Sequence, residues 1–300
     1  NGESQFSQQF LTGNTLSSNT LYKGTSASNT HTISSLVEMN PDSTVKIRYQ
    51  PTISISNSHS NSSDISNSYN DLVPLLNSSV YSSHSSSNSF GFQQTFSYYH
   101  ALHKKGASLN ISHNLSISPS SGNSYSLNDL TSYTAIPSTN QDRFSDNSTR
   151  GSNASVGIVY RNPFSKKLTG DVNIFNSFNY NNGKAFTYDL NPQTGLYDIY
   201  VDNLSRDLVR KQFYETIRPE ITYNFTKTAR LMANVGVQFM QTFNKFNKGY
   251  PDINRYDTFL LPSKSFNNSL FSVSYDMSVR QPDISSMRPD TIIYDSYSSS

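Results

Sequence analysis

The 300-residue chain has a net charge of only +2, and its lysines and arginines are scattered rather than grouped. This distribution excludes the large basic surface with which proteins bind nucleic acid, so no nucleic-acid partner is expected. The absence of cysteine excludes disulfide bonds and thiolate metal sites. Aromatic residues make up 13% of the chain, which is too many for a disordered protein even though serine and asparagine abound.

Residues 45–58 alternate between apolar and polar side chains. Ile47 and Ile53 share one parity with the other apolar residues, whereas Lys46 lies on the polar parity. Successive side chains of a strand point to opposite faces, so this stretch predicts a strand with one apolar and one polar face. It is longer than the roughly 9–11 residues that a tilted strand needs to cross a bilayer. Because Pro51 cannot donate a ladder hydrogen bond, we expect a bulge or a break in pairing there.

Similar segments recur along the chain in pairs that are joined by short turns. The predicted hairpins, in chain order, are 6–10 with 16–22, 30–39 with 45–58, 90–100 with 107–118, 153–160 with 168–180, and 212–225 with 230–243, followed by a single strand at 269–280. Between these pairs lie Ser- and Asn-rich segments at 57–88, 119–152 and 181–211, which we predict to be long polar loops. A further loop is predicted to connect the last hairpin to the final strand, and a short hairpin is predicted near 197–201.

Short turns alternating with long loops, around strands with one apolar face, are typical of membrane barrels. The sequence therefore predicts an all-β fold, an antiparallel transmembrane β-barrel with short turns on one rim and long polar loops on the other. About nine to eleven strands are visible and no closing strand follows, so residues 1–300 are expected to form one segment of a larger barrel, with no plug domain. The aromatic residues near strand ends are expected to form a girdle at the membrane interface; they are Phe90, Tyr98, Tyr99, Tyr160, Tyr180, Tyr223, Phe225 and Phe243.

Five charged residues lie on the polar parity of the predicted strands: Lys46, Arg48, Arg218, Glu220 and Asp276. A lysine or arginine that faced lipid at the middle of the bilayer would cost roughly 2–4 kcal/mol, so these side chains are expected to face the lumen. There they would either contact a solute or a plug domain, or form ladders of salt bridges and hydrogen bonds between neighbouring strands.

The chain carries no motif that points to catalysis. It has no G-x-S-x-G elbow, no dinucleotide-binding glycine pattern and no phosphate-binding loop. His100 and His103 have the spacing of two metal ligands, but no third ligand follows at a suitable distance. We therefore expect a protein that is not an enzyme and that has no cofactor and no metal site.

The segment 271–289 combines an aromatic-rich strand with spaced arginine and proline residues: Tyr275, Arg280, Pro282, Met287 and Pro289. In this it resembles the barrel regions of Bacteroidota-type TonB-dependent receptor-like transporters. The resemblance implies a bacterial outer-membrane location, surrounding outer-membrane lipid, and transport of a solute too large for passive diffusion. It also implies a plug domain and TonB as partners through other parts of the protein, and a surface lipoprotein as an accessory partner.

Two other functions are compatible with the same residues. A passive porin-like channel would have the same strands without energy coupling. A Ser- and Asn-rich surface adhesin or structural β protein would use the alternating strands in a water-soluble fold.

Overall fold

The computed structural model describes residues 2–9, 15–71, 74–135, 137–246 and 251–279. Strands make up most of these residues, and no α-helix occurs among them. The elements are β1 (Gly2–Gln9), β2 (Thr15–Ser34), β3 (Val37–Met39), β4 (Val45–Asn70), β5 (Asn77–Ala101), β6 (Ser108–Ser132), β7 (Thr139–Pro163), β8 (Leu168–Leu190), β9 (Tyr197–Tyr200), the 3-10 turn η1 (Asp202–Leu204), β10 (Arg206–Asn224), β11 (Arg230–Phe246), β12 (Ile253–Asn267) and β13 (Ser272–Asp276).

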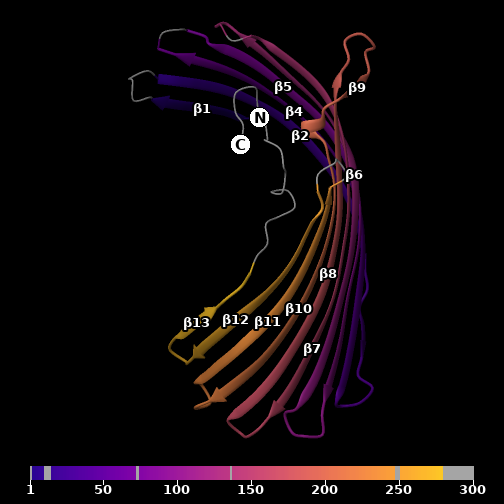
Figure 1. Ribbon diagram of the computed structural model, residues 1–300, viewed down its shortest axis with the longest axis vertical. Helices are drawn as coiled ribbons and strands as arrows, with labels where there is room; N and C mark the ends of the chain where they lie inside the picture. The colour runs from indigo at the N-terminus through magenta and orange to yellow at the C-terminus, as the bar shows by residue number, and fades with distance from the viewer. Residues whose placement is uncertain (1, 10–14, 72–73, 136, 247–250, 280–300) are drawn as a thin grey trace.

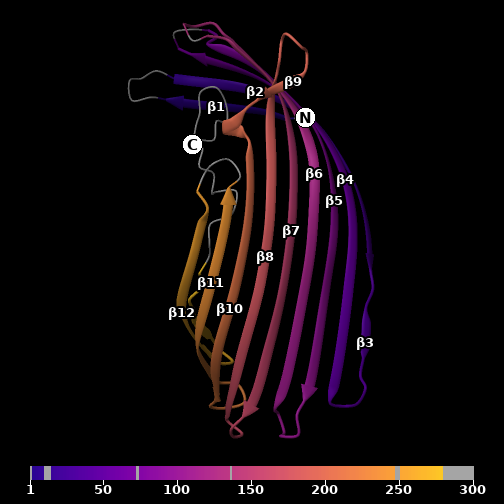
Figure 2. The same cartoon turned by 45° about the vertical axis from the view of Figure 1, so that its right-hand side comes forward.

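All thirteen strands belong to one antiparallel sheet. Its order is β1-β2-β4-β5-β6-β7-β8-β10-β11-β12-β13, with β3 added beside β4 and β9 beside β8. Figures 1 and 2 show this sheet as a tall, twisted and curved wall. The outermost strands β1 and β13 do not pair with each other in the described part of the chain, so the sheet is open there. The predicted all-β antiparallel fold is confirmed, and closure into a barrel is not observed.

The predicted hairpins are confirmed as β1/β2, β3/β4, β5/β6, β7/β8 and β10/β11. The predicted strand 30–39 is divided, however: residues 30–34 are the end of β2, which also pairs with β4, and only 37–39 form β3. Residue 10 of the predicted strand 6–10 lies outside the described residues. The turn before β4 is held by Asp42, whose carboxylate accepts hydrogen bonds from the backbone N–H groups of Thr44 at 2.6 Å and Val45 at 3.0 Å. The short hairpin near 197–201 is also present, because β9 pairs with β8. Alternation of side chains and turn chemistry was therefore sufficient to find the local pairs.

The predicted long polar loops are wrong. Instead, β4 and β5 continue through 57–88 and are joined by residues 71–76, while β6 and β7 continue through 119–152 and are joined by residues 133–138. Much of 181–211 likewise belongs to β8, β9 and β10. The segment after β11 was also predicted as a loop, but it contains β12, which pairs with β11 over its whole length. The last strand is shorter than predicted, since β13 ends at Asp276.

Side-chain hydroxyl groups explain how such polar sequences form strands. Ser58 and Ser60 of β4 are hydrogen-bonded to Ser87 and Ser85 of β5, each at 2.7 Å. The neighbouring pair of β2 and β4 is bridged in the same way, with Thr20 and Ser66 at 2.9 Å. Facing hydroxyl pairs of this kind each stabilise a sheet by roughly 0.2–1 kcal/mol. Hydrogen bonds across the ladder thus replace the apolar contacts that these segments lack.

The predicted break at Pro51 is confirmed on one side of β4. The pairing of Pro51 with Gln94 of β5 is continuous, but β2 ends at Ser34 and β3 begins only at Val37. The Pro51 carbonyl accepts a hydrogen bond from the N–H of Ser35 at 3.1 Å. In an antiparallel strand the N and O of one residue point to the same side. The nitrogen that has no hydrogen therefore faces the gap between β2 and β3.

Candidate functional site

The sheet has two faces of different chemistry, and cross-strand pairing assigns each residue to one of them. The apolar face carries a row of nine hydrophobic residues that crosses the sheet from β3 to β12. In order across the strands, this central row is Met39, Ile47, Tyr98, Ile111, Ile158, Ile174, Ile217, Val237 and Leu260. No residue on the described strands of this row is charged, so the apolar character runs unbroken across them.

Aromatic residues accompany the central row on both sides along the strands. Toward the short turns, Tyr223 of β10 lies in a row with Leu231 and Phe266. Toward the other end, Phe213 lies in a row with Phe178 and Tyr256. Of the girdle residues predicted from the sequence, Tyr98 instead lies in the central row, and Tyr99 lies on the opposite face beside Lys46.

The apolar face is the more exposed one. Ile217 is 39% exposed, and Leu260 at the end of the same row is 62% exposed. By contrast, every buried residue in a described strand belongs to the polar face; among them are Ser155, Asp171, Ser177, Arg210, Thr242 and Asn244. A curved sheet crowds the side chains of its concave face and spreads those of its convex face. The polar face is therefore the concave one, and the sheet turns its apolar side outward.

Several polar residues interrupt the apolar face. Those between the aromatic rows include His100, His113, Asn176, Glu215 and Lys264, whereas Gln94 and Gln241 lie in the row of Phe213 itself. Two of them satisfy each other, since the Gln94 amide nitrogen and a His113 ring nitrogen lie 2.6 Å apart. Glu215 pairs across the strands with Asn176 and Phe239, one row from Ile217.

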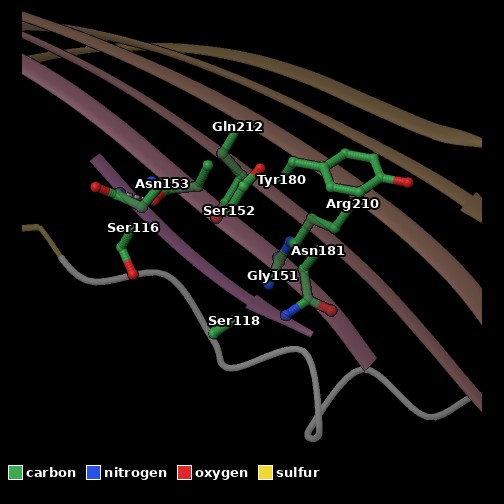
Figure 3. Close-up of a pocket in the computed structure, with 10 residues that line it drawn as sticks. Ser116, Ser118, Gly151, Ser152, Asn153, Tyr180, Asn181, Arg210 and Gln212 are labelled. Carbon is green, nitrogen blue, oxygen red and sulfur yellow. Dashed lines mark hydrogen bonds between the residues drawn. The ribbon is translucent and has the colours of Figure 1, made fainter. Parts of the chain in front are cut away.

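A polar pocket of about 410 Å³ lies across β6, β7, β8 and β10. Two neighbouring rows of the polar face line it: Ser116, Asn153, Asn179 and Gln212, and then Ser118, Gly151, Asn181 and Arg210. Figure 3 shows these side chains projecting from adjacent strands, with Arg210 beside Asn181. Asn153 is hydrogen-bonded to Asn179 across the strands. Amide, hydroxyl and guanidinium groups together suit a polar ligand, and Arg210 suits one with a negative charge.

The five charged residues predicted to face the lumen all lie on the polar face, but in two groups. Lys46 and Arg48 are on β4, whereas Arg218 and Glu220 are on β10, with β5, β6, β7 and β8 between them. Asp276 of β13 belongs to the cross-strand row of Glu220.

Several of these charged side chains contact residues of neighbouring strands, as expected for ladders of salt bridges and hydrogen bonds between strands. Arg48 forms an exposed ion pair with Glu38 at 3.6 Å, which contributes little to stability. The Glu220 carboxylate accepts a hydrogen bond from the Asn234 amide at 3.3 Å. The Arg218 side chain lies against β11 at Gly236, where an added Cβ would approach Arg218 Nε to 3.1 Å.

Other polar-face residues were missed from the sequence. Arg161 of β7 binds Asp171 of β8 through two hydrogen bonds of 2.9 and 2.8 Å, in the row of Glu220. Arg210 was missed because it fell at the end of a predicted loop. Its parity matches that of Gln212, which begins the predicted strand, and that signal could have placed it on the polar face.

At the end of the sheet away from the short turns, three aromatic rings form a cluster outside the two aromatic rows. Tyr197 of β9 contacts Tyr125 and Phe144, and its hydroxyl donates a hydrogen bond of 2.7 Å to Asp142. Burial and the bond to Asp142 raise the pKa of Tyr197 to about 12.

Of the residues that carried the family resemblance, Tyr275 lies in β13, whereas Arg280, Pro282, Met287 and Pro289 lie outside the described residues. Within the described ranges, no helix is long and apolar enough to cross a membrane. In the same residues, no group of three His, Cys, Asp or Glu side chains is placed to hold a metal ion. No family model matches the chain, and no curated protein matches it.

Proposed function

We propose that this sheet is part of the wall of a β-barrel in a bacterial outer membrane, and that its polar face lines the path of a polar solute. The observation that carries the proposal is that the sheet exposes apolar side chains and buries polar ones, which is the opposite of the arrangement in a water-soluble protein. Exposed apolar side chains form an unbroken row on the convex face, while polar side chains are buried on the concave face. Water would penalise the first arrangement, whereas lipid outside and water inside would favour both.

The height of the apolar band supports the same proposal. On β10 the band extends from Tyr223 to Phe213, which span ten residue steps. At about 3.3 Å per residue and a strand tilt of about 40°, this corresponds to roughly 25 Å along the membrane normal. That height matches the apolar band of outer-membrane barrels, which is also about 25 Å tall.

The polar extension of the strands fits the part of a barrel outside the membrane. Beyond the band, β4 and β5 continue as Ser- and Asn-rich strands whose hydroxyl groups pair with each other. Short turns lie on the inner side of outer-membrane barrels and longer connections on the outer side. The extension would therefore project from the cell surface and lengthen the path of the solute.

The pocket at Arg210 is the proposed contact for the solute on this wall. It is polar, it faces the concave side, and it holds a buried cation that would attract a negatively charged group. Energy coupling through TonB and a plug domain follows from the resemblance of residues 271–289, and uptake that stops on adding a protonophore would support it. Unchanged uptake would favour a passive channel.

The cysteine-free chain allows a direct test of the two faces. We would place single cysteines at Thr216 on the polar face and Ile217 on the apolar face of the full-length protein in vesicles. A membrane-impermeant maleimide should label Thr216→Cys and leave Ile217→Cys unlabelled until detergent is added. Equal labelling at the two positions would contradict the membrane assignment.

A second measurement addresses the solute path. Labelling Gln212→Cys, at the pocket, with a bulky maleimide should lower the ion conductance or solute uptake of the full-length protein. The matched control is Phe213→Cys, which places the same reagent on the opposite face. An equal effect at both positions, or no effect at Gln212→Cys, would contradict transport along the polar face.

A further inference from the structure

Three exposed cations lie on the apolar face just beyond the aromatic row of Phe213. Lys211 of β10 is flanked in its row by Tyr180 and Phe243. Arg150 of β7 and Lys245 of β11 lie one row farther, on either side of Asn182 and Val209. A fourth basic residue nearby, Lys184, is already paired with Asp207 at 3.4 Å. The described residues form no ion pair with Lys211, Lys245 or Arg150.

Surface pockets accompany these cations. Lys211 and Lys245 line a pocket of about 460 Å³ that also contains Val209 and Phe243, with Asp252 as its one carboxylate. Arg150 lines a second pocket of about 470 Å³, together with Ile55 and Phe90. Each pocket therefore combines apolar side chains from the two rows just beyond the band with a basic group beside them.

The position of the cations along the strands identifies the ligand chemistry. Counting from Ile217 in the central row, Lys211 is six residues away and the row of Lys245 is eight residues away. At about 3.3 Å per residue and about 40° of tilt, these steps place the cations roughly 15 and 20 Å from the middle of the membrane. The hydrocarbon ends at about 15 Å from the middle and the headgroups at about 20 Å. The basic groups would thus lie at the level of lipid phosphates.

Resting on the proposed membrane location, we infer that the pockets at Lys211/Lys245 and Arg150 bind phosphate-bearing lipids of the outer leaflet. The ammonium and guanidinium groups contact the phosphates, and the apolar side chains beside them in the same two rows contact the ends of the acyl chains nearest the headgroups. The Asp252 carboxylate can accept hydrogen bonds from a sugar or hydroxyl part of the headgroup. Such lipids would hold the wall at a fixed depth in the membrane.

The test compares full-length protein in detergent micelles with three probes: diphosphorylated lipid A, the same lipid without phosphates, and inorganic phosphate. Bound lipid is counted by native mass spectrometry. The lipid with phosphates should bind, the lipid without them should bind at least tenfold more weakly, and millimolar inorganic phosphate should not displace the bound lipid. Displacement by inorganic phosphate, or equal binding of both lipids, would overturn the inference.

The variants Lys211→Ala/Lys245→Ala and Arg150→Ala locate the binding. The double variant should weaken lipid A binding roughly 30-fold, because each basic group near the lipid surface contributes about 1 kcal/mol. The matched control is Lys46→Ala/Arg48→Ala, which removes two charges from the polar face and should leave binding unchanged. Equal loss in the control, or no loss in the pocket variants, would also overturn the inference. If cysteine labelling supports a lipid-facing band while these variants bind lipid normally, only this inference fails.

Discussion

Ile217 of β10 and Ile174 of β8 face each other across the middle of the sheet, on the side where the side chains are exposed. In a water-soluble protein such a pair would belong to a core. Here it belongs to a row of nine apolar residues with no second layer of the described chain packed over it. Because exposed apolar side chains are unfavourable in water and favourable in lipid, matched substitutions on the two faces should have different effects on stability in a bilayer.

Replacing Ile217 by arginine should lower the free energy of unfolding in a bilayer by about 2–4 kcal/mol, because a lipid-facing cation at the midplane is poorly solvated. The neighbouring Thr216→Arg places the same side chain on the polar face, where the cost should be much smaller. Urea titration of the protein refolded into lipid vesicles measures both values. Similar losses for the two variants would contradict the assignment of the faces.

Glu215 is the acidic residue closest to the central row on β10, and Glu215→Leu should increase stability in a bilayer. The expected gain is about 1–2 kcal/mol, smaller than for a basic residue at the same depth. The matched variant Glu220→Leu removes the acceptor of the Asn234 hydrogen bond on the polar face and should decrease stability. Both changes are measured by the same vesicle titration, and a loss of stability in Glu215→Leu would be inconsistent with contact between this side chain and lipid.

The hydroxyl pair of Ser60 and Ser85 offers a test of how the polar extension is held together. A double-mutant cycle with Ser60→Ala and Ser85→Ala should yield a coupling energy of about 0.2–1 kcal/mol. As a control, Ser60→Ala is combined with Ser112→Ala. Ser112 lies on β6 in a cross-strand row that contains neither Ser60 nor Ser85, so the effects of these two substitutions should be additive. Hydrogen exchange of the β4 and β5 amides provides the local stabilities, and additivity within the first cycle would contradict a role for the hydroxyl pair.

Alkaline pH should loosen the outer aromatic cluster. The pKa of Tyr197 is about 12 in the folded protein and about 10 in an unfolded chain, so folding favours the protonated hydroxyl. Its contribution to stability is therefore complete below pH 10 and disappears as the pH rises through 12. Thermal unfolding should distinguish Tyr197→Phe from the parent at pH 9 and no longer at pH 12. A difference that is the same at both values would exclude a role for this titration.

Local pairing was predictable because each hairpin depends on residues close together in the sequence. The turn at Asp42 and the alternation after it are sufficient to pair β3 with β4. The extension was mispredicted for the same reason, since Ser60 and Ser85 separately resemble loop residues. They form strands because their hydroxyl groups face each other across the sheet. That contact cannot be recognised from the composition of either segment alone.

The sequence by itself determined that the chain forms long antiparallel strands with one apolar and one polar face, because side-chain alternation depends only on backbone geometry. It also placed Lys46, Arg48, Arg218, Glu220 and Asp276 on the polar face. Only the tertiary structure decided how the hairpins lie beside one another, how far the strands extend and which way the sheet curves. That curvature buries Arg210 and leaves Ile217 exposed, while the register brings Lys211, Lys245 and Arg150 to two neighbouring rows, because register and bending are properties of the whole sheet.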